Sequence, residues 1–262
     1  MTQSKHFSTK HLQLVGFNQL SMVRDEVFKE PKQQQPDFKF DQNVVTVFDD
    51  MVTRSVPYYL EIQRMIGELA AEYAQPNTVI YDLGCSTGTT LVNMNATVQP
   101  DIKFIGIDDS PQMLNKCREN LQRVGVVRPF DLTACDLNKG VNVKDASVVV
   151  LCLTLQFIRP LYRVNLLQQI LAGMREGGCV ILVEKILAEE SGLNRNFIKY
   201  YYDFKKRNQY SEIEIAQKRE ALENVLVPYK LSEDIEMLKL AGFQQVEVFF
   251  KWYNFAGMIA FK

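Results

Sequence analysis

The residues best suited to bind a ligand lie in one short stretch, Tyr81-Asp82-Leu83-Gly84-Cys85-Ser86-Thr87-Gly88-Thr89. This stretch follows an apolar run that is typical of a strand and precedes a predicted helix. Glycines at such a turn let the backbone bend tightly and let a cofactor approach the main chain. Asp108 ends the next predicted strand, 24 residues after Gly84, where a carboxylate can accept hydrogen bonds from ribose hydroxyls. The pattern predicts a nucleotide or nucleoside site.

The charges of this site favour a cationic adenosyl ligand over a dinucleotide. A dinucleotide loop reads G-x-G-x-x-G, whereas Ser86 stands here at the place of the second glycine. Asp82 would repel a pyrophosphate but suits the ammonium of a methionine. Asp136, at the end of the third predicted strand, is placed to meet an adenine amino group. Three carboxylates at successive strand ends therefore predict S-adenosylmethionine, although each aspartate also suits a helix N-cap.

Histidine is absent from the body of the chain, since the only two, His6 and His11, lie in its polar beginning. A catalytic Ser-His-Asp or Cys-His group is therefore excluded beyond Leu12, and we expect no metal site. Five cysteines without CxxC spacing predict reduced thiols. Cys152 as a nucleophile is disfavoured, because no neighbouring cation is evident that would lower its pKa.

Length and composition indicate one α/β domain. The chain has 262 residues, a formal net charge of −1, 47% hydrophobic and 23% charged residues. The charge argues against a protein that grips a phosphate backbone. No run approaches the roughly 20 apolar residues of a membrane helix, and the first ten residues lack the apolar core of a signal peptide. We expect a cytoplasmic protein without direct contact to nucleic acid or membrane.

The order of the predicted elements indicates a doubly wound sheet. Helical periodicity strengthens over 51–73, and strands are expected at 78–83, 103–107, 129–134, 146–153 and 179–183, with helices over about 89–96, 111–124 and 161–174 between them. Ser110-Pro111 supplies an N-cap and a proline at the first helical position. Such alternation predicts parallel strands.

The end of the chain breaks this rhythm. The section 191–240 is almost entirely helical, with a capping box at Ser211–Glu214 that starts a helix to about Val225, and two strand-like runs follow at 245–251 and 255–261. We therefore predict a Rossmann-like class I S-adenosylmethionine-dependent methyltransferase fold. Its mainly parallel seven-stranded sheet ends in a β-hairpin, and a helical insertion spans about 190–240. Residues 1–40 are expected to form a polar, partly flexible leader, and 41–262 a single domain.

Four segments carry a more specific pattern: Asp50–Tyr59 with its Arg-Ser-Val-Pro sequence, the Tyr81–Gly88 loop, Thr154–Phe157, and Asp203–Val225 with its Gln-Lys-Arg and Leu-Glu-Asn-Val sequences. Together they resemble the carboxy-S-adenosyl-L-methionine synthase family, which serves bacterial tRNA wobble-uridine modification. The similarity runs from about Phe38 to Lys262. Generic methyltransferases share the loop but not the first and last segments.

The resemblance implies that the methyl group of S-adenosylmethionine is carboxylated at the expense of prephenate, giving carboxy-S-adenosylmethionine and phenylpyruvate. It implies that Arg219 pairs with the new carboxylate, which an arginine fork recognises bidentately, and that Tyr59 lines the pocket. It further implies a homodimer. The expected cofactor-binding residues are Tyr59, Asp82, Gly84, Cys85, Ser86, Asp108, Asp109, Asp136, Leu137, Cys152 and Arg219.

Two positions depart from the family pattern. Cys152 stands where the family usually has an asparagine that touches the methionine part of the cofactor, and a cysteine is a poor hydrogen-bond donor. Tyr201-Tyr202 replaces a histidine pair that many members have. Both changes leave open a paralogue with other sulfonium chemistry.

Other interpretations remain at this point. Arg219, like its neighbour Lys218, suits a solvated helix face, and the cluster of Lys199, Lys205, Lys206 and Arg207 beside tyrosines suits an RNA-binding surface or simply a wet one. An ordinary methyltransferase that acts on a small molecule or RNA, and a non-catalytic adenosyl-binding protein, are the alternative functions.

Overall fold

The computed structural model describes residues 23–32 and 34–262, and within them the predicted sheet is present. Its seven strands are β1 (Val79–Leu83), β2 (Lys103–Asp108), β3 (Phe130–Ala134), β4 (Ala146–Cys152), β5 (Met174–Lys185), β6 (Val246–Trp252) and β7 (Phe255–Phe261). Their order is β3-β2-β1-β4-β5-β7-β6. The first five are parallel, whereas β7 runs antiparallel to β5 and β6. The predicted terminal hairpin is confirmed.

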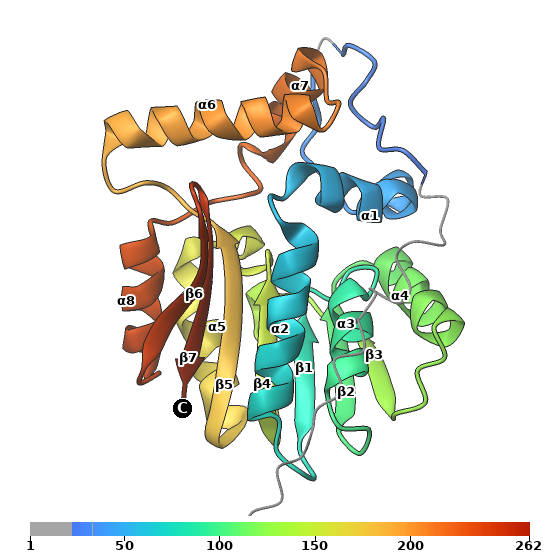
Figure 1. Cartoon of the computed structure of the whole chain (residues 1–262), viewed down its shortest axis with the longest axis vertical. Helices are drawn as coiled ribbons and strands as arrows, with labels where there is room; N and C mark the ends of the chain where they lie inside the picture. Colours follow the sequence, from blue (N-terminus) through green and yellow to red (C-terminus); the bar gives the residue numbers. More distant parts are fainter. Residues whose placement is uncertain (1–22, 33) are drawn as a thin grey trace, which may run out of the picture.

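Helices cover both faces of this sheet (Figure 1). On one face pack α2 (Tyr59–Tyr73), α3 (Thr89–Thr97) and α4 (Pro111–Arg123), and on the other α5 (Pro160–Gly173) and α8 (Leu231–Ala241). Successive side chains of a strand point to opposite faces. In β4, Val148 and Val150 accordingly enter one apolar core, and Val149 and Leu151 enter the other. This double burial explains why β4 is an unbroken apolar run.

A cap layer lies over the carboxyl end of the sheet, where Figure 1 shows α1 (Gln42–Ser55), α6 (Ser191–Arg207) and α7 (Glu212–Leu222). The predicted capping box starts α7, because the Ser211 hydroxyl accepts from the Glu214 amide and the Glu214 carboxylate accepts from the Ser211 amide. Two short 3-10 turns, η1 (Leu137–Lys139) and η2 (Leu155–Phe157), follow β3 and β4. The cap layer and the strand ends together enclose the site.

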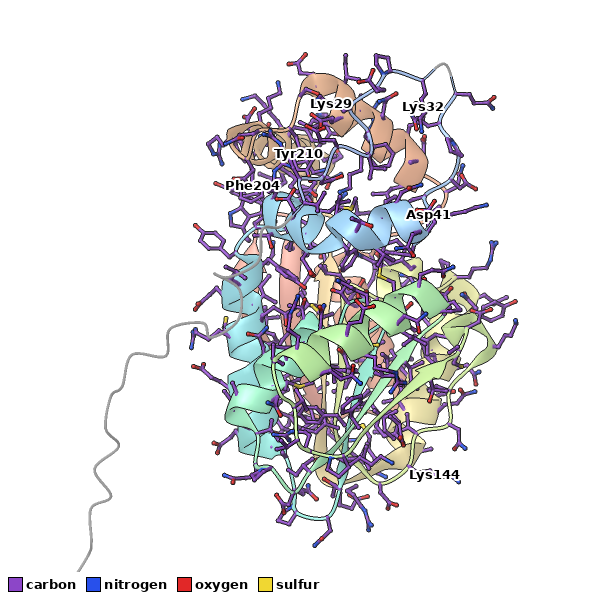
Figure 2. The ribbon with its side chains drawn as sticks, turned by 90° about the vertical axis from the view of Figure 1, so that its right-hand side faces the viewer. Lys29, Lys32, Asp41, Lys144, Phe204 and Tyr210 are labelled. Atoms are coloured by element: carbon purple, nitrogen blue, oxygen red, sulfur yellow. The ribbon has the colours of Figure 1, made fainter. Side chains whose placement is uncertain are left out.

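The segment before α1 packs against this layer. Residues 1–22 and 33 of the expected leader lie outside the described residues, and residues 23–32 and 34–40 make defined contacts. The Lys32 amide donates to Gln217 of α7 at 2.7 Å, and the Phe38 amide donates to the Ala221 carbonyl at 2.9 Å. Figure 2 shows Lys29 and Lys32 beside the helices above α1, with Tyr210 among them. Residues 34–40 thereby reach the mouth of the site.

Two helical expectations differ from the structure. The periodic segment 51–73 is divided between α1 and α2, because Pro57 has no amide proton to continue a helix and Tyr58 adopts a left-handed φ of 55°. The helix after Ser211 ends at Leu222, not near Val225. Of the helices expected in the insertion, α8 packs on α5 and joins the sheet layer. Only α6 and α7 belong to the cap.

Candidate active site

A cavity of about 460 Å³ lies between the strand ends and the cap layer. Ten of the predicted site residues line it: Tyr59, Gly84, Cys85, Ser86, Asp108, Asp109, Asp136, Leu137, Cys152 and Arg219. Asp82 is not among its lining residues. Further walls come from α1, α6, α7, η2, the ends of β5 and β7, and the segment before α1. Residues far apart in the sequence thus meet at one end of the sheet, as parallel strands require.

The shape of the glycine-rich loop depends on backbone conformations that only glycine adopts readily. Gly84 has a φ of +81°, and a Cβ built there would lie 2.3 Å from the Thr154 hydroxyl oxygen. Only glycine fits, for conformational and steric reasons at once. The amides of Gly84 and Cys85 both donate to the Ile107 carbonyl, at 2.7 and 3.0 Å, which fixes the loop against β2. The loop therefore presents its main chain to the cavity.

Asp108 is held in place at the end of β2 by two backbone amides. Its Oδ2 accepts from the Ser86 amide at 3.0 Å and its Oδ1 from the Ser110 amide at 2.9 Å. Burial raises its pKa to about 6, although these hydrogen bonds oppose the shift. The carboxylate is ionised at neutral pH and rigid. Asp108 forms a wall of the cavity, whereas the N-cap of α4 is Ser110, so the interpretation of Asp108 as a helix N-cap is wrong.

Asp136 and Asp109 complete the acidic end of the cavity. Asp136 caps η1 by accepting from the Asn138 amide at 3.0 Å, and the Asn138 side chain lowers the pKa of Asp136. Asp109 is exposed, and partial burial, followed by repulsion from Asp136, raises its pKa. Leu137, which lies between Asp136 and Asn138 in the sequence, contributes an apolar side chain to the cavity wall. This end offers acceptors for the donor groups of a nucleoside.

Asp82 lies behind the lining, with an exposed fraction of 1%, and its Oδ2 has no hydrogen-bond partner among the described residues. Burial, followed by repulsion from Asp108, raises its pKa to about 8. Burial and, to a smaller extent, the charge of Asp82 raise the pKa values of Tyr59 and Cys152, which line the cavity. A buried, unpartnered carboxyl beside a cavity suits a cationic group there. The residues present thus fit a sulfonium or an ammonium.

Tyr59 and Cys152 face the cavity from α2 and β4. Burial raises the pKa of both groups, so each is protonated. The thiol therefore lacks the low pKa that a cysteine nucleophile needs. Gln63 donates to its sulfur at 3.5 Å, while the other amide atom of Gln63, Oε1, has no partner among the described residues. This polar pair is incompletely satisfied in the free protein.

Aromatic side chains that the sequence reasoning did not select close the mouth of the cavity. Phe40 packs edge-on against Phe157 of η2, with ring centroids 5.4 Å apart, and Phe38 packs on Phe40 at 5.1 Å. The amides of Leu155 and Gln156 donate to the buried Glu184 carboxylate at 3.0 and 2.8 Å, which positions η2. An irregular polar segment gave no signal that its phenylalanines would line a site.

The charge-rich helices contribute a cationic end. Lys218 and Lys205, expected on a solvated face and in an exposed basic cluster, are 7% and 6% exposed and line the cavity. Lys199, Lys206 and Arg207 of that cluster do lie on the surface. Arg219 is exposed as well as lining the cavity, and it forms no hydrogen bond or salt bridge within the described residues. Its guanidinium is therefore available to an anion.

Comparison with known proteins identifies the family. A carboxy-S-adenosyl-L-methionine synthase from Methylococcus capsulatus is 54% identical over 242 residues, covering 92% of this chain and 100% of that protein. Another from Desulfotalea psychrophila is 42% identical, covering 91% of this chain and 97% of that protein. The chain belongs to the carboxy-S-adenosyl-L-methionine synthase family. It is therefore an enzyme, a transferase that uses S-adenosylmethionine, as the resemblance predicted.

The fold alone is shared more widely. A family model described as a methyltransferase domain matches residues 80–178. A solved O-methyltransferase family protein from Burkholderia thailandensis has a TM-score of 0.63 at 14% identity, covering 85% of this chain and 60% of its own. Human N-acetylserotonin methyltransferase has a TM-score of 0.56 at 14% identity and covers 84% and 55%. The chain thus spans 55 to 60% of the length of these structures, which confirm the predicted fold class.

The cationic end of the cavity lies outside the segment that the methyltransferase-domain model matches. Arg219, Lys205 and Lys218 all follow residue 178. Tyr201, at which the sequence predicts a departure from the family pattern, is buried, and its hydroxyl donates to the Ser55 carbonyl at 2.9 Å. It joins α6 to α1, so this departure preserves the cap layer. Among the described residues, no helix is both long and apolar enough to cross a membrane.

Proposed function

We propose that this chain converts S-adenosylmethionine and prephenate to carboxy-S-adenosylmethionine and phenylpyruvate. One observation carries the proposal: a single cavity has fixed carboxylates at the sheet end and, at the cap end, the guanidinium of Arg219, which pairs with none of the described residues. A cationic adenosyl ligand and an anionic co-substrate have opposite electrostatic requirements. A cavity with both kinds of wall holds them side by side, which is what a transfer between them needs.

The chemistry balances without a base from the protein. Prephenate, a dianion, loses carbon dioxide from one ring carbon and hydroxide from another, and the ring becomes aromatic as phenylpyruvate forms. The hydroxide takes a proton from the sulfonium methyl and leaves as water. The resulting ylide carbon attacks carbon dioxide, and the new bond gives the carboxymethyl sulfonium. The chain has to position the reactants and keep bulk water away from the ylide.

The residues of the cavity have distinct roles in this proposal. Asp108 accepts from the ribose hydroxyls, Asp136 lies toward the adenine end, and the main chain of Gly84, Cys85 and Ser86 supports the adenosyl group. Buried Asp82 stabilises its positive charge. Tyr59 is held neutral by burial and packs where the methionine part would lie.

Arg219 is the group proposed to receive the transferred carboxylate. A guanidinium offers two parallel N–H donors to a carboxylate, whereas the ammonium of a lysine offers a point charge. Because α7 begins with a complete capping box, the register that presents Arg219 to the cavity is well defined. We further propose that the protein is a cytoplasmic homodimer without a metal, and that its product supplies the carboxymethyl group for tRNA wobble-uridine modification.

The test is the reaction itself. Purified protein is incubated with S-adenosylmethionine and prephenate, and mass spectrometry follows both products. We expect phenylpyruvate and a sulfonium that is heavier by one carboxyl group. Unconsumed prephenate would refute the proposal. Label from the S-methyl group in an added acceptor would instead indicate an ordinary methyltransferase, and binding without turnover of any acceptor a non-catalytic protein.

The variant Arg219→Lys separates the guanidinium from its charge. We expect turnover to fall about 10- to 100-fold, because one charge-assisted bidentate contact is lost, while binding of S-adenosylmethionine changes little. Arg207→Lys, an exposed position on α6, is the matched control and should leave the rate unchanged. An equal rate for Arg219→Lys and the parent would contradict the role of the fork.

A further inference from the structure

Three lysines from three different elements meet in the cap end of the cavity. Lys185 ends β5, Lys205 lies on α6 and Lys218 on α7, and all three line the same space. The ammonium groups of Lys185 and Lys205 lie on the ring of Tyr201, at 5.3 and 4.5 Å from its centroid. Neither ammonium donates a hydrogen bond within the described residues. Lys205 and Lys218 are buried and Lys185 is half-buried, and such convergence of cations is not explained by packing alone.

The protein supplies few anions to balance them. The Lys218 nitrogen lies 3.9 Å from Asp25, whose Oδ2 also accepts from the Tyr210 hydroxyl at 2.6 Å. No carboxylate of the described residues lies within 4 Å of the Lys185 or Lys205 ammonium. Glu223 lines the same cavity but is exposed and forms no salt bridge in that part of the chain.

Burial lowers the pKa of each of the three lysines. For Lys205, repulsion from Lys218 and Lys185 lowers the pKa further, so the three groups sense one another. Buried like charges are unfavourable unless an anion joins them. A bound carboxylate would raise all three pKa values and supply the missing acceptor. The free protein therefore has a site that is electrostatically incomplete.

We propose that Lys185, Lys205 and Lys218 form a carboxylate subsite, which binds the 2-oxo acid carboxylate that the co-substrate retains while Arg219 meets the one that is transferred. This inference rests on the proposed function, because it assigns the second negative charge of a dicarboxylate. Two separate anion sites fix both ends of such a molecule relative to the sulfonium. The subsite thereby selects substrates that carry a 2-oxo acid side chain, with Tyr201 as its apolar floor.

The test compares two variants with a matched control. Lys205→Met and Lys185→Met keep the length of the side chain and remove its charge. Lys206→Met is the control, because Lys206 follows on the same helix but is exposed and pairs with Glu212 at 2.6 Å. Titration calorimetry in the presence of S-adenosylmethionine measures binding of phenylpyruvate, which has the carboxylate, and of phenylacetone, which lacks it. Rates with prephenate give KM and kcat.

We expect Lys205→Met and Lys185→Met to weaken phenylpyruvate binding and to raise the KM for prephenate about 10- to 100-fold, with a smaller change in kcat. Phenylacetone should bind all variants equally weakly, and Lys206→Met should match the parent. Unchanged phenylpyruvate binding would overturn the proposal. A parallel loss of S-adenosylmethionine affinity would also overturn it, since the lysines would then hold the methionine carboxylate.

The two proposals fail in different ways. A parent protein that does not consume prephenate, but binds phenylpyruvate in a manner that depends on Lys205, refutes the proposed function and supports the subsite. A parent that turns prephenate over while Lys205→Met retains its KM supports the proposed function and refutes the subsite.

Discussion

Replacing Asp82 by asparagine should stabilise the free protein at alkaline pH and weaken its binding of S-adenosylmethionine. Asp82 is buried without a hydrogen-bond partner for Oδ2 in the described residues, and its pKa is raised from 3.8 to about 8, first by burial and then by Asp108. Between these two values the folded protein keeps a proton that the unfolded chain releases. Asp82 therefore does not reduce the free energy of unfolding below about pH 4, and it reduces this free energy progressively as pH rises to about 8.

The size of this loss follows from the pKa difference. About four pKa units at about 1.4 kcal/mol each give an upper limit of about 5 kcal/mol above pH 8. At pH 5 only roughly a quarter of it is present. Asparagine is neutral at both pH values and carries no such penalty. A chain of this size changes its Tm by about 2–4 °C per kcal/mol, so the gain at pH 9 is on the order of 10 °C.

Thermal unfolding of both proteins at pH 5 and pH 9, with and without S-adenosylmethionine, checks the reasoning. Without ligand, Asp82→Asn should gain Tm relative to the parent mainly at pH 9. S-adenosylmethionine should raise the Tm of Asp82→Asn by less than it raises the Tm of the parent, because the neutral amide no longer favours a cation. Asp131→Asn is the control, since Asp131 is an exposed strand carboxylate paired with Lys103 at 2.5 Å. A Tm difference that is the same at both pH values, or ligand stabilisation that is unchanged, would refute the electrostatic role of Asp82.

Two further substitutions probe the ligand loop and the departure from the family pattern. Gly84→Ala should lose S-adenosylmethionine binding and several degrees of Tm, because its Cβ would meet Thr154. Gly125 also has a positive φ but has open space around it, so Gly125→Ala should lose only about 1–2 kcal/mol of unfolding free energy. Equal losses of stability in the two variants would contradict the steric explanation. Cys152→Asn should lower the Kd for S-adenosylmethionine about 3- to 10-fold and raise the Tm, because the new amide can donate a hydrogen bond to Gln63 Oε1. Weaker binding by calorimetry would show that the cysteine is a functional adaptation.

Local signals explain what could be predicted from the sequence. The strand ends, the loop at Gly84 and the cap at Ser110 each depend on a few neighbouring residues, whose backbone requirements are the same in any fold. The parallel sheet then follows from the alternation of elements, and it brings Asp108 and Asp136 to one edge without further information. The acidic end of the cavity was predictable for this reason.

The cationic end was not predictable, because it depends on how separate helices pack. Lys205 and Lys218 occur in charge-rich helices, which are usually solvated, and only the packing of α6 and α7 over the strand ends buries them. Phe38 and Phe40 lie in a segment without periodicity, and their position follows from backbone contacts such as that of Phe38 with Ala221 of α7. Pairing across such sequence distances leaves no local pattern.

The acidic and the cationic ends of the cavity come from different parts of the chain. The carboxylates at the strand ends lie within residues 80–178, the part of the chain that the methyltransferase-domain model matches. Arg219, Lys205 and Lys218 reach the cavity from α6 and α7, which lie outside the residues 80–178 that the methyltransferase-domain model matches. Lys205 and Lys218 are buried, so their attraction for an anion is weakly screened, whereas the charge of the exposed Arg219 is screened more strongly. We therefore expect substitutions in the cap layer to change the use of the co-substrate while leaving adenosyl binding intact.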